Sequence, residues 1–380
     1  AWEEKIMAAT IRDIKKRTGL SLATISKYLN GGNVLPENRI LIEEAINELH
    51  YEVNELARGL VTHKTKTIGV LAYDIQCLFV GSMLHYLGME LHKKGYGMLI
   101  CDSCNDEKLQ KENLQFLLSR KVDGILVFAV GMHGKFLHAA KKANVPVVLV
   151  DRSFQDEEYD CVEVDNRTAI YRATNKLIEN HHKKIAVIAS NIEYTGRERV
   201  KGYSDAMNQA GLEIPKEYCK LGRHSFEHGY RGMKELLELE DRPTGVILGN
   251  YNTMLGGIMA LNESGLSCPQ DVSLIGVDNL PMTQVLRPKL WLIVQPMETM
   301  CEKAVAMLLE RVNARNCEEE SAIGVFSEKK MVEVVVAVVD EAVFRGAPAF
   351  TAEEMQLARR DQYGISGFAV LEGISVGVRR

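Results

Sequence analysis

The chain has 380 residues, a formal net charge of −5 at pH 7 and 46% hydrophobic residues. This length predicts about two or three domains with sizeable cores, and the negative balance excludes a nucleic-acid binder that relies on its overall charge. No apolar run is long enough to span a membrane, no signal peptide opens the chain, and the eight cysteines are scattered. We therefore expect a reduced, cytoplasmic protein in which any contact with nucleic acid comes from a local basic patch.

The N-terminal segment contains such a patch on two short predicted helices, 10–17 and 21–30. Thr10 and Ser21 can cap them, and Gly19 between them suits a tight turn that needs positive φ. Ile25 and Leu29 lie four residues apart and so share one buried face. The basic residues of this region are Arg12, Lys15, Lys16, Arg17 and Lys27. This pattern indicates a helix-turn-helix, whose second helix enters the DNA major groove.

A third predicted helix, 36–49, closes a small three-helix head that we assign to residues 8–50. Its expected apolar stripe is Ile40, Ile42, Ala45, Ile46 and Leu49. Residues 51–66 follow as a connector in which Asn54 can cap a short helix that Gly59 weakens. Such a helix is too short to be stable alone in water. The connector is therefore either a solvated linker or a hinge that becomes helical only on DNA.

From Thr67 onward, β-branched apolar runs alternate with amphipathic helices in two series. The first series is 67–73, 79–94, 96–101, 106–119, 122–128, 134–143 and 146–151; the second is 184–189, 196–210, 217–221, 227–239, 245–249, 253–264 and 273–277. Unbroken apolar strands between helices predict parallel sheets covered on both faces. We assign residues 67–340 to a two-lobed α/β core of two doubly wound parallel sheets, with a small-molecule cleft at the strands' carboxyl ends.

Residues 10 to about 312 resemble the lactose-repressor/galactose-repressor family of bacterial transcription regulators. In the head and connector the resemblance rests on Thr10-Ile11-Arg12-Asp13-Ile14, Gly19-Leu20-Ser21, Thr24-Ile25-Ser26-Lys27, Leu29-Asn30, Tyr51, Asn54, Ala57-Arg58 and Leu60. In the core it rests on Thr67-Ile68-Gly69-Val70, Val122-Asp123-Gly124-Ile125, Leu149-Val150-Asp151-Arg152, Val164-Asp165-Asn166, Arg197-Glu198-Arg199, Gly202-Tyr203, Ile275-Gly276-Val277-Asp278 and Gln295-Pro296. The resemblance implies a periplasmic-binding-protein-like core and a homodimer, or a higher oligomer, whose heads read a near-palindromic operator in double-stranded DNA.

For the DNA contacts, the resemblance implies that Leu22, Ala23 and Lys27 read bases. Phosphate or positioning contacts would come from Thr10, Ser21, Thr24, Ser26, Asn30, Asn54 and Ala57. Lys27 could instead be an ordinary surface lysine. Leu60 matches the family's minor-groove wedge, and the alternative for it is a residue that docks the connector on the core.

For the effector, the resemblance implies contacts from Asp74, Phe79, Asp165, Arg199, His224, Asn250 and Asp278. Carboxylates, an amide, a guanidinium and an aromatic ring suit a sugar or related polyol. For Asp165 and Asn166 the alternative is a cap at the junction of the lobes. No separate cofactor is expected.

Several positions depart from the family pattern. Cys77-Leu78-Phe79-Val80 stands where the family often has Asn-Pro-Phe-Phe, and Tyr251 follows Asn250 where it often has Asp. His224 occupies a position where an aromatic side chain often covers the ligand. Lys15 replaces a small residue between the first two helices, so we expect its stem to snorkel there.

The end of the chain and some isolated motifs stand outside the resemblance. We expect 332–339 to be the last strand of the second lobe and leave 341–380 unassigned, either an oligomerisation element or a non-native extension. Cys101-Asp102-Ser103-Cys104 does not open a helix, as a redox pair would, and His181-His182 lacks a second pair at metal-ligand spacing. No phosphate-binding loop or nucleophile–base site is present, so we predict neither a metal site nor an enzyme.

The sequence therefore predicts a sequence-specific DNA-binding transcriptional regulator, a repressor, that is controlled by a small ligand bound between two lobes. The alternative is a stand-alone sugar-binding protein with no role on DNA.

Overall fold

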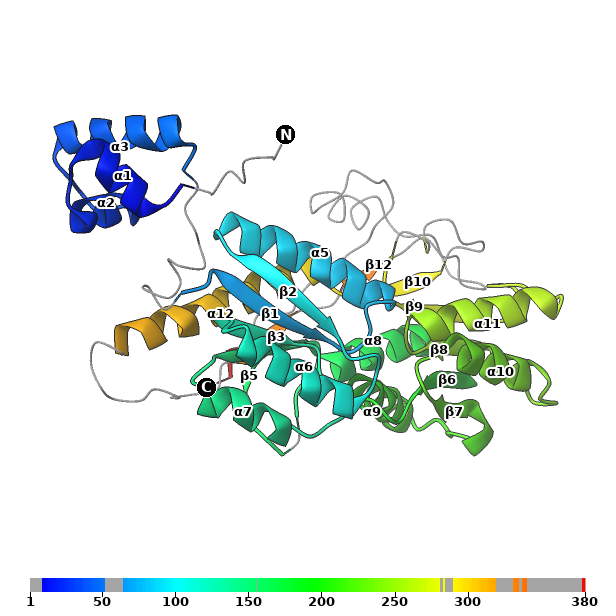
Figure 1. Cartoon of the computed structure of the whole chain (residues 1–380). Coiled ribbons are helices and arrows are strands. Elements are labelled where there is room, and N and C mark those ends of the chain that lie inside the picture. The colour runs from blue at the N-terminus through cyan, green and yellow to red at the C-terminus, as the bar shows by residue number, and fades with distance from the viewer. Residues whose placement is uncertain are drawn as a thin grey trace, which may run out of the picture. The chain divides into compact units, whose positions relative to one another are not determined.

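The computed structural model describes residues 9–51, 64–154, 156–280, 283, 290–318, 331–334, 337–339 and 378–379. It divides into two compact units, residues 1–66 and 67–380, called the head and the core below. Figure 1 labels helices α1, α2 and α3 in the head and shows the two α/β lobes of the core side by side. Within the described residues, no helix is both long and apolar enough to cross a membrane.

The head is a three-helix unit, as predicted. Its helices are α1 (Ile11–Thr18), α2 (Leu22–Leu29) and α3 (Pro36–Leu49). Ile14, Ile25 and Ile42 are fully buried and meet at its centre. Gly19 ends α1 at φ +72°, which confirms the left-handed turn expected there.

Two expectations about side chains in the head were wrong. Ile40 is 57% exposed, because it lies about 200° around the helix from Ile42 and cannot share its face. Lys15 is exposed on α1, whereas its neighbour Ile14 occupies the core. The lysine stem therefore does not have to snorkel between the first two helices.

The first lobe of the core is a helix-covered sheet of seven strands in the order β13-β11-β5-β4-β3-β1-β2. The strands are β1 (Thr67–Ala72), β2 (Gly97–Asp102), β3 (Gly124–Val127), β4 (Val147–Val150), β5 (Asp160–Val164), β11 (Met331–Val334) and β13 (Val378–Arg379). Only β13 is antiparallel to its neighbour among these pairs. The helices are α5 (Leu78–Lys93), α6 (Glu107–Ser119), η1 (Lys135–Leu137), α7 (His138–Lys142) and α12 (Met297–Glu318). Helices α5 and α12 cover one face, and α6 and α7 cover the other.

The second lobe repeats this plan with six strands in the order β12-β10-β9-β8-β6-β7. They are β6 (Ile185–Ser190), β7 (Cys219–Gly222), β8 (Gly245–Leu248), β9 (Ser273–Val277), β10 (Trp291–Val294) and β12 (Ala337–Val339). Helices α8 (Asn166–Glu179) and α9 (Tyr194–Gln209) pack together, as do α10 (Phe226–Leu237) and α11 (Tyr251–Glu263); η2 (Lys216–Tyr218) precedes β7. The two parallel sheets confirm the predicted fold class.

The chain passes between the lobes more than once. Strand β5 of the first sheet leads into α8 of the second lobe, and β10 of the second sheet leads into α12 of the first. The expectation of a single last strand at 332–339 was wrong for its first part, because Met331–Val334 pairs with β5 in the first sheet. Only Ala337–Val339 joins the second sheet, antiparallel to β10. The predicted series also omitted β5, α8, β10 and α12.

Candidate DNA interface and effector site

One side of α2 faces away from the hydrophobic core of the head. Leu22, Ala23 and Lys27 are exposed, whereas Ile25 is fully buried on the opposite side. Arg12, Lys15 and Lys16 of α1 are also exposed, and Arg17 pairs with Glu48 at 2.7 Å. The exposed side of α2 therefore combines apolar groups with a cation, which suits the edges of base pairs.

Local hydrogen bonds hold this helix in place. The Ser21 hydroxyl accepts from the Thr24 amide at 3.0 Å, and the Asn30 amide group donates to the Ser26 carbonyl at 2.8 Å. At the start of α1, the Thr10 amide and hydroxyl donate to Asp13 at 2.8 and 2.7 Å. Several of the expected phosphate-contacting side chains thus also define the helix ends.

Tyr28 ties α2 to α3. Its hydroxyl donates to Glu43 at 2.7 Å, and Arg39 donates to the same carboxylate oxygen at 2.8 Å. These bonds lower the pKa of Glu43, with the Arg39 bond the largest cause. Helix α2 is therefore held against α3 by side-chain hydrogen bonds as well as by the apolar core. Asn54, Ala57 and Leu60, the expected contacts of the connector, lie outside the described residues.

In the core, Arg199 of α9 is the buried cation at the carboxyl ends of the second lobe's strands. Its side chain donates from Nε to Asn166 Oδ1 and from Nη1 to the Gly249 carbonyl, both at 2.7 Å. Both acceptors are neutral, so these bonds orient the guanidinium without neutralising its charge.

Asp278 lies at the end of β9, near Arg199, and is also buried. Burial raises the pKa of its carboxyl, although the charge of Arg199 and a 2.6 Å hydrogen bond from Gln295 lower it. Its backbone has φ +79°, and Asp151 at the end of β4 has φ +73°. Left-handed backbone at non-glycine residues is uncommon and gathers at functional sites.

The first lobe contributes charged groups to the same region. Arg152 donates to Asp151 at 3.3 and 3.4 Å and stacks on the Tyr73 ring at 4.3 Å. The charge of Asp151 raises the pKa of Asp278, so the two lobes face each other here. Tyr73, Asp151, Arg152 and Gln295 were not among the effector residues expected from the sequence, although each follows a strand, which is the position where such sheets bind ligands.

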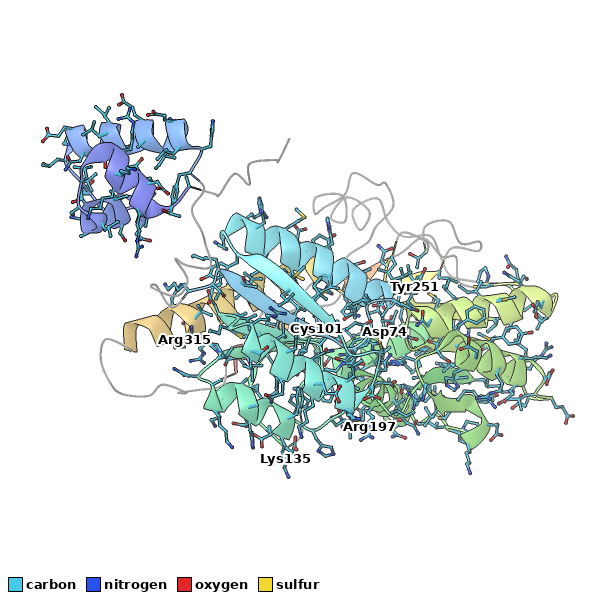
Figure 2. The ribbon with its side chains drawn as sticks, viewed as in Figure 1. Asp74, Cys101, Lys135, Arg197, Tyr251 and Arg315 are labelled. Carbon is cyan, nitrogen blue, oxygen red and sulfur yellow. The ribbon has the colours of Figure 1, made fainter. Side chains whose placement is uncertain are left out.

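The other expected effector residues have local structural partners. Asp165 caps α8 by accepting from the Thr168 amide at 2.9 Å, and Asn250 caps α11 by accepting from the Thr253 amide at 3.0 Å. Asp74 accepts from Gln76 at 2.9 Å and Asn105 at 3.0 Å. Phe79 is packed in the core of the first lobe. In Figure 2, Asp74 and Tyr251 lie toward the junction of the lobes, away from Lys135 and Arg315.

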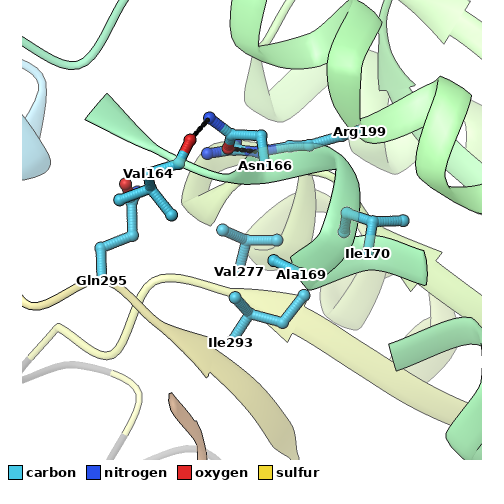
Figure 3. A pocket seen from close by; sticks show the side chains of 8 residues that line it. All are labelled: Val164, Asn166, Ala169, Ile170, Arg199, Val277, Ile293 and Gln295. Atoms are coloured by element: carbon cyan, nitrogen blue, oxygen red, sulfur yellow. Dashed lines mark hydrogen bonds between the residues drawn. The ribbon is translucent and has the colours of Figure 1, made fainter. Parts of the chain in front are cut away.

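A narrow gap lies beside Arg199, where the chain crosses between the lobes, and it has no room for a water molecule. Its lining is Val164, Asn166, Ala169, Ile170, Arg199, Val277, Ile293 and Gln295. Figure 3 shows the Arg199 guanidinium running along Asn166 at the polar end, above an apolar floor. The gap as it stands is therefore too small for a sugar.

The cysteine pair and the histidine pair noted in the sequence form neither a disulfide nor a metal site among the described residues. Cys101 is buried and Cys104 exposed, and both are free thiols. His182 shares a 2.8 Å hydrogen bond with Thr244, and burial lowers its pKa. Among the residues that the structure describes, no group of three or more His, Cys, Asp or Glu side chains is placed to hold a metal ion.

A helix-turn-helix head joined to a two-lobed core with a polar cleft defines a ligand-controlled DNA-binding protein. Residues 65–330 match the family model of periplasmic binding proteins and the sugar binding domain of the LacI family. The chain belongs to the LacI/GalR family of transcription regulators.

Similar proteins cover both units. The HTH-type transcriptional repressor PurR of Pasteurella multocida (strain Pm70) is 32% identical over 318 residues, which are 83% of this chain and 95% of that protein. Catabolite control protein A of Priestia megaterium is 30% identical over 310 residues, 81% and 93% of the two chains. PurR is a transcriptional repressor, and this chain is accordingly a ligand-controlled, DNA-binding transcriptional repressor rather than an enzyme.

Solved structures support the same fold. The transcription regulator CcpA of Lactococcus lactis has a TM-score of 0.65 and 25% identity, and the match covers 73% of this chain and 99% of that chain. The lac repressor dimer bound to operator and the anti-inducer ONPF has a TM-score of 0.74 and 21% identity, with coverages of 88% and 98%. At that identity the second likeness bears on the fold alone.

Proposed function

We propose that α2 reads one half-site of a near-palindromic operator. Leu22 and Ala23 would contact thymine methyl groups, and Lys27 would donate to guanine acceptors. Thr10, Ser21, Thr24, Ser26 and Asn30 would position the helix on phosphates, with Asn54, Ala57 and Leu60 acting from the connector. The observation that supports this proposal is the joint exposure of Leu22, Ala23 and Lys27 on one side of α2.

Selection from a library of random-sequence duplexes tests the DNA proposal, and the expected product is a near-palindrome. Binding to that sequence should weaken steeply with salt, because phosphate contacts release counterions. Deleting residues 1–66 should abolish DNA binding and preserve ligand binding. A salt slope close to zero would contradict the proposed interface. A repressor acts where the operator is, so we place the protein in the cytoplasm.

A near-palindrome requires two heads, and we propose a homodimer that uses α5. Leu78 and Met89 of this helix are 50% and 43% exposed, and eleven residues of spacing put them on one side. Ile100 on the adjacent edge strand β2 is also exposed. Sedimentation should give a dimer, and Met89→Glu should shift it toward monomer, whereas Met259→Glu on α11 serves as the control.

We infer that the effector is a sugar or related polyol held between the lobes. Arg199 is oriented by neutral partners, and Asp278 offers a buried carboxylate nearby. A guanidinium and a carboxylate together can donate to and accept from neighbouring hydroxyl groups. Lobe closure on the ligand would shift the first lobes within the dimer and so change the spacing of the heads.

A thermal-shift screen against sugars, sugar phosphates and nucleosides tests the effector proposal. Asp278→Asn should remove the shift caused by the effector while leaving operator binding intact. The Asn side chain keeps an oxygen for the Gln295 hydrogen bond, so the fold is expected to persist. A full ligand response in this variant would mean that the cleft is elsewhere.

A further inference from the structure

His224 lies in the loop between β7 and α10, directly before the residue that caps α10. Ser225, the next residue, accepts from the His228 amide at 3.1 Å and starts α10. The His224 side chain is only 13% exposed. Its Nε2 atom is buried and has no hydrogen-bond partner among the described residues. A buried acceptor without a partner is costly in a folded protein, unless something absent from the free chain completes it.

The charges around His224 determine which form of the ring is present. Burial lowers its pKa well below the ordinary value, and the charges of Arg199, Arg152 and His228 lower it further. The imidazole is therefore neutral near pH 7. A neutral ring carries one proton, and Glu193 Oε2 lies 3.8 Å from Nδ1. The carboxylate favours the proton on Nδ1, which leaves the lone pair on Nε2.

We propose that His224 is a specificity residue of the effector cleft, whose Nε2 accepts a hydrogen bond from a hydroxyl or N–H group of the ligand. This inference rests on the proposed function, because it places the ligand beside Arg199. It assigns the position a role different from stacking, the role expected where the family has an aromatic side chain.

A second buried acceptor without a partner among the described residues indicates which chemical groups the ligand must carry. Gln295 donates from Nε2 to Asp278, and its Oε1 is buried with no partner in the described part of the chain. His224 Nε2, Gln295 Oε1 and the Asp278 carboxylate are all acceptors, whereas Arg199 is a donor. The cleft therefore selects a ligand rich in hydroxyl or N–H donors, and an ether or a methyl group opposite His224 would leave its Nε2 unpaired.

The first test determines the protonation state of the His224 imidazole in the full-length protein without any ligand. The chain has 10 histidines, so ¹⁵N-histidine labelling and comparison with His224→Phe would assign the His224 ring. At pH 7 we expect a proton on Nδ1 and none on Nε2. A charged ring, or a proton on Nε2, would overturn the proposal.

The second test uses D-glucose, D-galactose and D-ribose with their deoxy counterparts 2-deoxy-D-glucose, D-fucose and 2-deoxy-D-ribose. For a sugar that binds, His224→Phe should weaken binding roughly 10- to 100-fold, because a buried hydrogen bond is lost. His224→Gln, which keeps an acceptor, should stay within about fivefold. Wild type should prefer the parent sugar to one deoxy counterpart, and His224→Phe should lose that preference. His92→Phe, at an exposed position of α5, is the control.

The outcomes separate this inference from the proposed function. Equal sugar binding by wild type and His224→Phe would overturn the inference while leaving the cleft in place. If none of the six sugars binds and Nε2 is unprotonated, the sugar class fails, whereas the acceptor role of His224 is supported. Unchanged sugar binding in Asp278→Asn would instead show that the proposed cleft is wrong.

Discussion

Replacing Arg199 with methionine tests how the effector site is built into the core. The substitution keeps an apolar stem but removes the hydrogen bonds to Asn166 Oδ1 and the Gly249 carbonyl, both 2.7 Å long. Hydrogen bonds from a charged group contribute about 1.5–3 kcal/mol each, and their loss leaves two acceptors without this donor. Removing a buried cation recovers part of its desolvation cost. We therefore expect a net loss of about 2–4 kcal/mol in the free energy of unfolding.

Urea denaturation followed by tryptophan fluorescence measures this loss. Trp291 on β10 is 2% exposed, and in a Trp2→Phe background it is the only tryptophan. With a slope near 3 kcal/mol per molar urea, the midpoint should fall by roughly 1 M. The response to effector should also disappear, whereas operator binding by the separate head should persist.

Lys201→Met on the same helix is the matched control. Lys201 is exposed and pairs with Glu198 on the surface, so its loss should change the free energy of unfolding by about 0.5 kcal/mol or less. If Arg199→Met is as stable as Lys201→Met, the two buried hydrogen bonds do not hold the cleft as described. An intact effector response in Arg199→Met would separately exclude this arginine from the ligand site.

Three further predictions concern the head and the cleft. Lys27→Ala should weaken operator binding by about 1–3 kcal/mol in gel-shift titrations if the lysine reads a base, whereas Asn47→Ala, at an exposed position of α3, should have little effect; an equal loss on random-sequence duplexes would place Lys27 among general phosphate contacts. Ile25→Ala removes a fully buried side chain and should cost about 2–4 kcal/mol, enough to unfold so small a unit; DNA binding should be lost while effector-induced thermal shifts remain, and intact DNA binding would contradict the core assignment. Burial lowers the pKa values of His224 and His182 in the folded state. Below the ordinary histidine pKa, the unfolded chain therefore binds more protons than the folded chain does. The core should therefore lose stability as pH falls below about 6.5, measured by urea midpoints, and His224→Phe should reduce that slope; an unchanged slope would refute the assignment.

Patterns of apolar residues predicted most of the elements, but not those whose stability depends on distant partners. Strand β5 was not predicted, because Asp160 and Glu163 interrupt its run of apolar residues, although both side chains are buried. Arg311 donates to Asp160 at 2.7 and 3.1 Å, and Tyr194 donates to Glu163 at 3.4 Å. Nothing near these residues in the sequence indicates that a buried carboxylate is neutralised by an arginine of α12.

The residues of the candidate site also differ in how much of their role could be predicted from the sequence. From the sequence, Asp165 was expected either as a cap or as a ligand contact, because both roles use the same oxygen at a strand–helix junction, whereas Asn250 was expected only as a ligand contact. The structure gives both of them a cap. Asp151 and Arg152 were visible as part of a motif, yet their place in the cleft depends on Tyr73 and on the opposite lobe.

The sequence by itself determined the head, because its helices depend on contacts within a few tens of residues. Caps at Thr10 and Ser21, the left-handed turn at Gly19 and the spacing of Ile25 and Leu29 suffice to define which side of the second helix is exposed. Only the tertiary structure decided the cleft. Its groups come from strand ends between Tyr73 and Gln295, and their charges and protonation depend on how two sheets, built from an interwoven chain, bring those ends together.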